Sequence, residues 1–175
     1  MVDVPSDGSP PSTLALATAA RCTSGRLICV CRDSEALSQT KSQIQELELG
    51  DVVSFRVGAD VCEVVKQYKN IDFTVVDHRI KDCDELLFAM DMNPKGSVVV
   101  LSNLFSGRRR VGASYVHARK CRGGIESAIL PVGDGMQVTK IGKNSGSCTR
   151  GKQEINTQED FLLVPIINLT TNQYH

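Results

Sequence analysis

Short runs of residues that are apolar at every position recur along the chain, and segments with helical periodicity separate them. The clearest runs are Leu27–Cys31 and Val98–Leu101, and Phe73–Val76 is similar apart from Thr74. A strand that is apolar on both faces has to be covered on both faces, as in a parallel sheet between two layers of helices. The chain is therefore expected to fold as an α/β domain.

The apolar runs and the helical segments alternate from the first residues onward. Strands are predicted at 2–4, 27–31, 52–57, 72–77 and 97–101, and helices at 12–20, 33–49, 61–68 and 82–92. This alternation predicts a doubly wound parallel sheet with helices on both faces. In sheets of this kind, ligands bind at the carboxyl ends of the strands.

The pattern changes after residue 124. Two apolar segments, 125–131 and 136–141, flank Val132-Gly133-Asp134-Gly135, whose glycines and aspartate suit a hairpin turn. The sheet is therefore expected to finish with an antiparallel pair. Polar residues and glycine dominate the sequence from 143 to about 160, which predicts a domain at 1–142 and a flexible C-terminal tail at 143–175.

The charge and the cysteine content restrict the classes of function. Lys and Arg number 20 and Asp and Glu number 20, so no whole-molecule field would attract a nucleic acid or a membrane. An RNA-associated protein, the third and least favoured reading, would depend on the basic stretch 108–122 alone. The 7 cysteines form no C-x-x-C pair, as is usual for reduced thiols. We expect a cytoplasmic protein with access to the nucleus.

The loop after the first strand is where a nucleotide cofactor would bind, because backbone amides at the start of a helix can approach the ligand there. Asp3, Pro5, Ser6, Asp7 and Gly8 are the candidate residues. Only one of them is glycine, and a proline stands where a tight glycine turn would be expected. The alternative is an ordinary loop between a strand and a helix.

An acidic residue after the second strand would bind the ribose hydroxyls of such a cofactor, and the expected distance from the first loop points to Asp33. The alternative is that Asp33 only caps the helix that follows it.

Two polar residues end the fourth and fifth predicted strands. Asp77 and Asn103 offer oxygen ligands for a hard cation such as magnesium, although they make a small ligand set. Cys29 and Cys31 would share one face of a strand, but two thiols are only half of a zinc site. His78 is a candidate general base; the alternative is an exposed loop histidine.

Three stretches of the sequence resemble one enzyme family. Residues 125–141 resemble the closing hairpin of the caffeoyl-CoA and catechol type O-methyltransferases, 71–77 resembles their fourth strand with its terminal Asp77, and 95–104 resembles their fifth. The sequence is most similar to an uncharacterised plant family described as methyltransferase-like, over roughly residues 1–142.

The resemblance implies the three-layer, Rossmann-like fold of methyltransferases that depend on S-adenosylmethionine (SAM), with a mostly parallel, seven-stranded sheet that ends in an antiparallel hairpin. It also implies a SAM pocket at Asp3–Gly8, around Asp33 and at Asp77. The relatives carry helices before their first strand, so the chain resembles an N-terminally truncated form.

The sequence departs from the family pattern at three places. The first loop lacks the glycines of the catalytic relatives. Cys31 stands where the second strand of these relatives ends in an acidic residue, and Ser102-Asn103 stand where they have Asp-Asn. Each departure weakens the binding of a cofactor or a metal.

Two functions follow as hypotheses. The first is a SAM-dependent methyltransferase that acts on a small-molecule or protein acceptor, with His78 as the base. The second is a non-catalytic relative that uses the fold as a binding or interaction module. Self-association as a homodimer is a further expectation.

Overall fold

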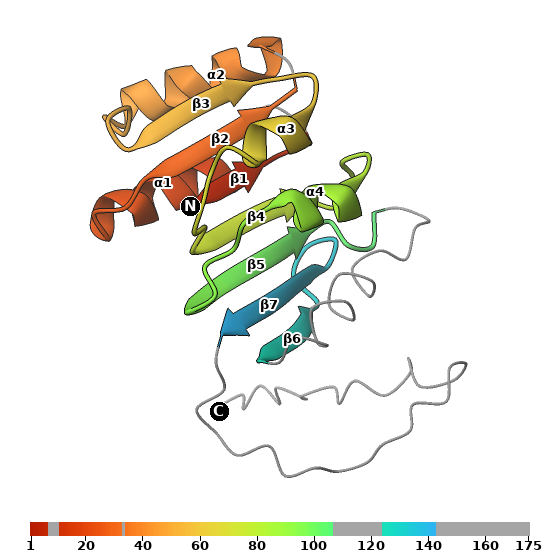
Figure 1. Ribbon diagram of the computed structural model, residues 1–175. Helices are drawn as coiled ribbons and strands as arrows, with labels where there is room; N and C mark the ends of the chain where they lie inside the picture. The colour runs from red at the N-terminus through yellow and green to blue at the C-terminus, as the bar shows by residue number, and fades with distance from the viewer. Residues whose placement is uncertain (7–10, 33, 107–123, 143–175) are drawn as a thin grey trace, which may run out of the picture. The chain divides into compact units, whose positions relative to one another are not determined.

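The computed structural model describes residues 1–6, 11–32, 34–106 and 124–142, apart from the side chains of residues 36 and 39. Strands and helices follow one another through these residues (Figure 1). In chain order the elements are β1 Val2–Val4, α1 Pro11–Cys22, β2 Leu27–Cys31, α2 Ser34–Glu46, β3 Val53–Val57, α3 Val61–Val65, β4 Phe73–Asp77, α4 Cys83–Ala89, β5 Gly96–Ser102, β6 Ile125–Leu130 and β7 Met136–Gly142.

The strands form one seven-stranded sheet in the order β3-β2-β1-β4-β5-β7-β6. Strands β1 to β5 are parallel, and β7 runs antiparallel between β5 and β6. The strand order reverses between β1 and β4, so the connections that follow these two strands leave in opposite directions. Their carboxyl ends therefore border the crevice where ligands bind in open α/β sheets.

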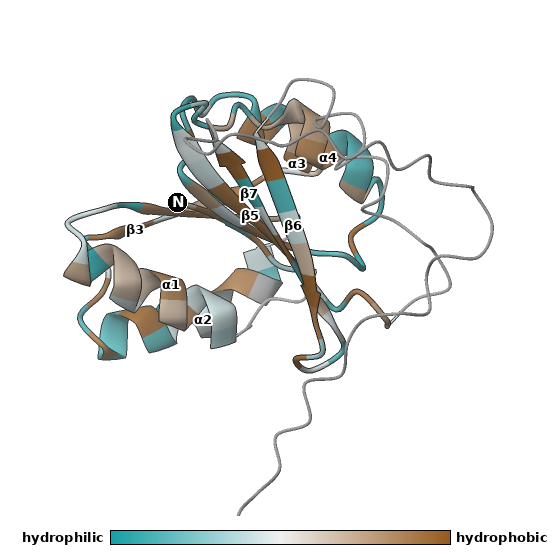
Figure 2. Ribbon diagram, turned by 90° about the horizontal axis from the view of Figure 1, so that it is seen from below, coloured by the Kyte–Doolittle hydropathy of each residue, from teal (hydrophilic) through white to brown (hydrophobic). Residues whose placement is uncertain are grey.

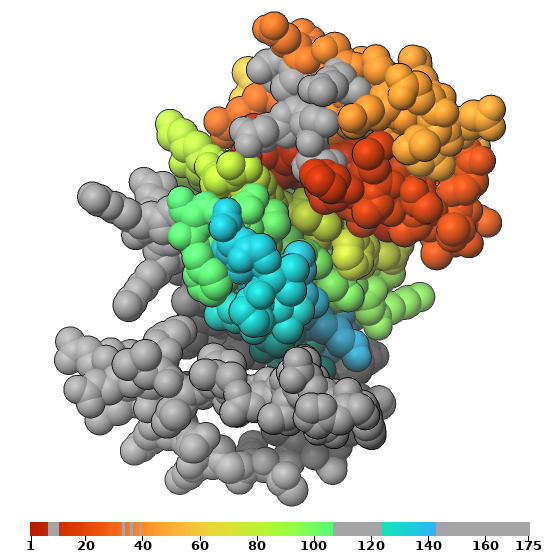
Figure 3. All heavy atoms as spheres, turned by 180° about the vertical axis from the view of Figure 1, so that it is seen from behind, coloured from red at the N-terminus to blue at the C-terminus, as the bar shows by residue number. Residues whose placement is uncertain are grey.

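Helices cover the sheet on both sides. Helices α1 and α2 lie on one face, and α3 and α4 lie on the other (Figure 2). In the space-filling view from behind, side chains of α1 and α2, red to orange, fill one end of their face, and residues of the β6–β7 hairpin, cyan to blue, are visible at the other (Figure 3). The described residues thus form three layers.

The alternation of side chains along the central strands divides the interior into two cores. Val2, Val4 and Val30 belong to the core that includes residues of α3 and α4. Cys29 and Cys31 belong to the core that includes residues of α1 and α2. Because successive side chains of a strand point to opposite faces, both faces of β1 and β2 have to be apolar or internally satisfied.

The predicted fold class, the parallel sheet and the antiparallel end are confirmed. Helix α4 is shorter than the predicted helix at 82–92. It ends at Ala89 because Met90 is extended (φ −73°, ψ 129°) and Met92 forms a parallel bridge with Ile71. This isolated bridge precedes β4 and competes with the last helical turn.

Helix α3 is also shorter than the prediction of 61–68. After Val65 the chain continues in turns, in which the amide of Gln67 donates to the Val64 carbonyl and that of Tyr68 to the Val65 carbonyl. These bonds span three residues instead of four. The helical spacing of apolar residues in the sequence therefore continues beyond the end of the α-helix.

Among the helices of the described residues, none combines the length and the apolar character that crossing a bilayer requires.

The first prediction concerns the packing of α1 on the sheet. Ala17 is completely buried, whereas Ala15 on the same helix is exposed. Leucine at position 17 would force the helix away from a closely packed surface, so Ala17→Leu is expected to lower the free energy of unfolding by about 1–3 kcal/mol. Ala15→Leu, the matched control, should change it by less than about 0.5 kcal/mol. Urea denaturation of both variants measures the difference, and equal stability would contradict the tight packing of α1.

Candidate functional site

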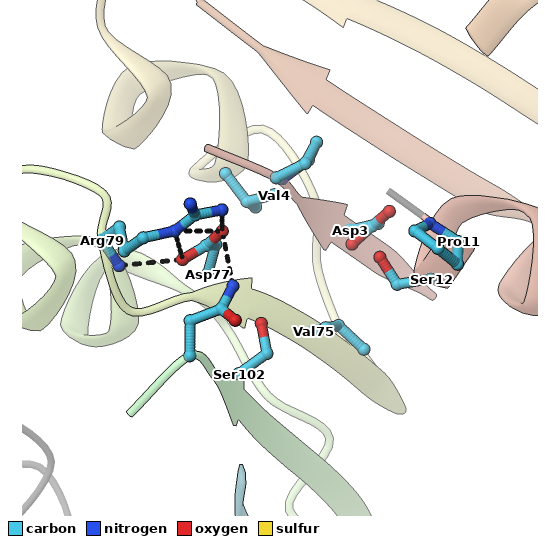
Figure 4. A pocket seen from close by; sticks show the side chains of 10 residues that line it. Asp3, Val4, Pro11, Ser12, Val75, Asp77, Arg79 and Ser102 are labelled. Atoms are coloured by element: carbon cyan, nitrogen blue, oxygen red, sulfur yellow. Dashed lines mark hydrogen bonds and ion pairs between the residues drawn. The ribbon is translucent and has the colours of Figure 1, made fainter. Parts of the chain in front are cut away.

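A cavity of about 250 Å³ lies at the carboxyl edge of the sheet, where β1, β4 and β5 end (Figure 4). The start of α1 forms the wall opposite the loop that follows β4. The residues that line the cavity are Asp3, Val4, Pro5, Pro11, Ser12, Val75, Asp77, Arg79, Ser102 and Asn103. The cavity is therefore at the point where the doubly wound topology places a ligand.

Asp77 is the most heavily hydrogen-bonded group in the cavity. Its Oδ2 accepts from the Ser6 hydroxyl at 2.6 Å and from Asn103 Nδ2 at 3.0 Å. Arg79 Nη2 donates to the same oxygen at 2.7 Å, Arg79 Nε lies 3.2 Å from both carboxylate oxygens, and the Arg79 amide donates to Oδ1 at 2.9 Å. The carboxylate thus has donors on both oxygens, and the guanidinium lies beside it in Figure 4.

This environment decides the charge of Asp77. Burial by itself would raise the pKa of the carboxyl group, but the hydrogen bonds from Arg79 and Ser6 and the positive charge of Arg79 outweigh that effect and lower the pKa to about 2. Asp77 is consequently ionised throughout the physiological range and forms a closed ion pair with a residue two positions further along the chain.

Asp3 is the second carboxyl group in the cavity and has a different environment. Its Oδ2 accepts a hydrogen bond of 2.5 Å from the Thr13 hydroxyl of α1, while its Oδ1 is buried and has no hydrogen-bond partner among the described residues. Burial raises the pKa of Asp3 to about 6; the Thr13 hydrogen bond opposes this shift, and the negative charge of Asp77 adds to it. Asp3 therefore lines the cavity and keeps one acceptor oxygen without a partner among the described residues.

The residues present do not fit a magnesium ion. Asp77 and Asn103 lie together as predicted, but Asn103 turns its amide nitrogen toward Asp77, and a nitrogen that donates cannot coordinate a cation. The remaining lone pairs of Asp77 face the donors of Ser6 and Arg79. The described part of the chain contains no group of three or more His, Cys, Asp or Glu side chains that could hold a metal.

His78 follows Asp77, and its side chain is only 6% exposed. This differs from the alternative of an exposed loop histidine. Its amide donates to the Ser102 carbonyl, and its Nε2 has no hydrogen-bond partner within the described residues. It does not belong to the residues that line the cavity. The role of His78 as a base therefore remains a prediction.

Among the other predicted cofactor residues, Asp3 and Pro5 line the cavity, and Ser6 reaches it through Asp77. Asp7, Gly8 and Asp33 lie outside the described residues, as does the proposed tail at 143–175.

The sequence alone did not predict two residues that contact the carboxylates of the cavity. Arg79 was missed because its role depends on a turn that folds it back onto Asp77, where the Ile80 amide donates to the Asp77 carbonyl. Thr13 was assigned only to a tightly packed helix. A buried carboxylate three positions into the chain was a signal that some donor on the following helix had to satisfy it.

Cys29 and Cys31 do share one face of β2, with their sulfur atoms 3.9 Å apart in the buried core beside Asp3. The hydrogen bond to Cys31 and burial both raise the pKa of the Cys29 thiol far above its ordinary value. A protonated thiol is a poor metal ligand, so this pair contributes to packing.

A second cavity, of about 350 Å³, borders the same loop after β4 on the side of β2 and β3. It is lined by the residues around the starts of α3 and α4, together with Arg32 and the loop residues Ile80 and Lys81. Charged groups of both signs surround it, including Asp60, Lys66 and Arg32. The carboxyl edge thus offers two adjoining hollows.

Over residues 1–159 the sequence matches the family described as "Protein of unknown function (DUF1442)". The chain belongs to this family. No curated protein matches the sequence at a significant level. The cavity described above is therefore the principal source of functional information for this DUF1442 protein.

Solved structures show which fold this DUF1442 chain shares. A methyltransferase from Geobacter sulfurreducens superimposes with a TM-score of 0.64 at 19% identity, over 81% of this chain and 70% of that chain. The SAH-bound methyltransferase of Podospora anserina gives 0.60 at 14% identity, over 79% and 69%. An O-methyltransferase from Streptomyces achromogenes, solved with SAM, gives 0.59 at 17% identity, over 81% and 72%. The protein is thus methyltransferase-like in fold.

The second prediction follows from the buried carboxyl group of Asp3. Its pKa in the folded protein, about 6, lies above the ordinary value of 3.8. The folded state therefore holds the proton more tightly, and the associated stability is complete below pH 3.8 and is lost as the pH rises through about 6. Two pKa units correspond to on the order of 3 kcal/mol.

Asp3→Asn should remove this loss between pH 4 and 6, as measured by urea denaturation at a series of pH values. Asp51→Asn, which changes an exposed carboxylate before β3, is the matched control and should keep the wild-type slope. If Asp3→Asn retained the full slope, the titrating group would be another residue.

Proposed function

We propose that the cavity at the ends of β1, β4 and β5 binds the methionine part of SAM. The observation that carries this proposal is the carboxyl group of Asp3, a residue that lines the cavity and whose buried Oδ1 has no hydrogen-bond partner among the described residues. A buried carboxylate oxygen costs free energy unless it accepts a hydrogen bond, and the ammonium group of an amino-acid ligand supplies a charged donor.

The charge of the cavity supports the same ligand. Among the described lining residues, Asp3 and Asp77 are acidic and Arg79 is basic, so the cavity carries one net negative charge once Asp3 is ionised. SAM has a sulfonium and an ammonium group against one carboxylate, and its net charge is positive. Charge complementarity therefore favours SAM over a nucleotide with negatively charged phosphates.

The size of the cavity indicates how the ligand would extend. A volume of about 250 Å³ is below the roughly 300–1,000 Å³ of pockets that hold a whole small-molecule ligand. We propose that the rest of the cofactor continues along the carboxyl edge toward the second cavity, beyond the loop that follows β4. The SAM- and SAH-bound structures with the same fold support this choice of ligand.

When bound, SAM would supply its methyl group to an acceptor oxygen or nitrogen, and the electrons of the broken carbon–sulfur bond would pass to sulfur. The protein would mainly orient the two reactants. Its described lining residues include two carboxylates but neither histidine nor lysine, so we propose as the base either Asp3 or a residue outside this described set, such as His78.

This shortage of bases, together with Pro5 in the cavity wall, favours a second candidate function. In this alternative the protein binds SAM or a similar amino-acid nucleoside without transferring the methyl group, and acts as a binding module. The two functions share the ligand and differ in turnover.

The third prediction tests the ligand. In calorimetric titrations, SAM and S-adenosylhomocysteine should both bind the full chain with micromolar affinity, because both carry the ammonium group. Asp3→Asn should weaken both by about 10- to 100-fold, the equivalent of one hydrogen bond between charged groups. Asp51→Asn is the control. It makes the same change from carboxylate to amide just before the amino end of β3, outside the residues that line the cavity, and it should bind as the wild type does.

Absence of binding to a folded wild-type chain would refute the SAM proposal. Binding that Asp3→Asn leaves unchanged would move the ligand to another site. If SAM binds, incubation with methyl-labelled SAM and pools of small-molecule and protein acceptors separates the enzyme from the binding module.

We also propose a plant origin, a cytoplasmic or nuclear location, a small-molecule or protein acceptor and self-association as a homodimer.

A further inference from the structure

Asp77 is the carboxylate that would have to hold a cation at this end of the cavity, but Arg79 of the same chain already pairs with it. A buried carboxylate needs positive charge or strong donors close to both oxygens. Arg79 supplies them through its amide, Nε and Nη2, all within 3.2 Å of Asp77. The Asp77 side chain is 8% exposed and that of Arg79 is 44% exposed, so the guanidinium covers the carboxylate on the side of the cavity.

The local backbone fixes this arrangement without help from a distant element. The Asp77 carboxylate accepts from the amide two residues further on, at 2.9 Å, while the Asp77 carbonyl accepts from the Ile80 amide, at 3.1 Å. The turn that follows β4 therefore places the guanidinium beside Asp77. A planar guanidinium that faces both carboxylate oxygens is a strong ion-pair geometry.

Asn103 completes the site from the next strand. Its backbone is left-handed, with φ of 57°, a conformation that asparagine tolerates better than most residues. In this conformation its Nδ2 donates to Asp77 Oδ2 at 3.0 Å. To coordinate a cation, Asn103 would have to present its amide oxygen instead. Its side chain is therefore oriented to donate to the Asp77 carboxylate, which Arg79 also contacts.

We propose that the Arg79 guanidinium permanently replaces a divalent cation at the Asp77–Asn103 end of the cavity, so that this site takes its ligand without a metal. The inference concerns the cavity of the proposed function, but it does not depend on SAM binding. It replaces the expected magnesium at Asp77 and Asn103 in this proposal, for the physical reason that the guanidinium already pairs with the carboxylate.

The replacement has a chemical consequence. A divalent cation can bind an acceptor hydroxyl and lower its pKa. A guanidinium offers only hydrogen-bond donors, and Asp77 already balances its charge. It therefore cannot coordinate a hydroxyl oxygen as a metal ion does. An acceptor at this site would therefore have to be nucleophilic without metal activation.

The fourth prediction tests the replacement with manganese as the probe, measured as loss of the free Mn²⁺ signal in electron paramagnetic resonance. The full wild-type chain should not bind Mn²⁺ through Asp77 up to about 1 mM, the weak end of protein cation sites. Arg79→Met removes the charge but keeps the length of the side chain. This variant should bind Mn²⁺ at least about tenfold more tightly than the wild type, because the positive guanidinium that repels the cation is no longer beside the Asp77 carboxylate. The double variant with Asp77→Asn should lose that binding.

Two controls define the role of the charge. Arg79→Lys keeps the positive charge and should still exclude Mn²⁺. Arg56→Met removes an exposed guanidinium of β3 that donates to the Tyr68 hydroxyl, and it should behave as the wild type does.

Wild-type binding of Mn²⁺ that Asp77→Asn abolishes would overturn the proposal, and this comparison needs no Arg79 variant to fold. A folded Arg79→Met protein that gains no Mn²⁺ site would overturn it as well. Neither result would bear on SAM binding, which the titrations above measure separately.

Discussion

The whole sheet is joined through β1, a strand of only three residues. Its register pairs Val2 with Ile28 of β2 on one side and with Thr74 of β4 on the other, so β3 and β2 connect to the rest of the sheet through it alone. A strand this short cannot contribute many hydrogen bonds. It is stable because both neighbours are longer and because its valines are buried on the face covered by α3 and α4.

The same constraint produces the site. Since side chains alternate, burying Val2 and Val4 in one core forces Asp3 into the other, beneath α1. Its register partner Cys29 is buried on the same face, and Thr13 satisfies one carboxylate oxygen while the other has no partner among the described residues. The polar residue in the central strand stands one position before the strand's end and borders the cavity, where a ligand can satisfy it.

The sequence was sufficient to predict the sheet but not the interactions at its edge. Uniformly apolar runs identify buried parallel strands, and the glycines at 133 and 135 identify the hairpin, because these are local signals. The burial of His78 and the end of α4 depend on tertiary contacts. The turn of Arg79 toward Asp77 is local, but it is a side-chain arrangement that no periodicity indicates. The Ile71–Met92 bridge joins segments far apart in sequence, and nothing in the helical periodicity of 82–92 indicates it.

The two carboxylates of the cavity illustrate how environment gives the same residue type different roles. Asp77 meets a guanidinium, an amide and a hydroxyl, and the pKa of about 2 means that it is permanently ionised and internally paired. Asp3 meets one hydroxyl and apolar surroundings, and its pKa of about 6 places its ionisation close to neutral pH. Only Asp3 has acceptor capacity left for a ligand. The ion pair therefore shapes one wall of the cavity, and the proposed recognition of a cationic ligand depends on the other wall.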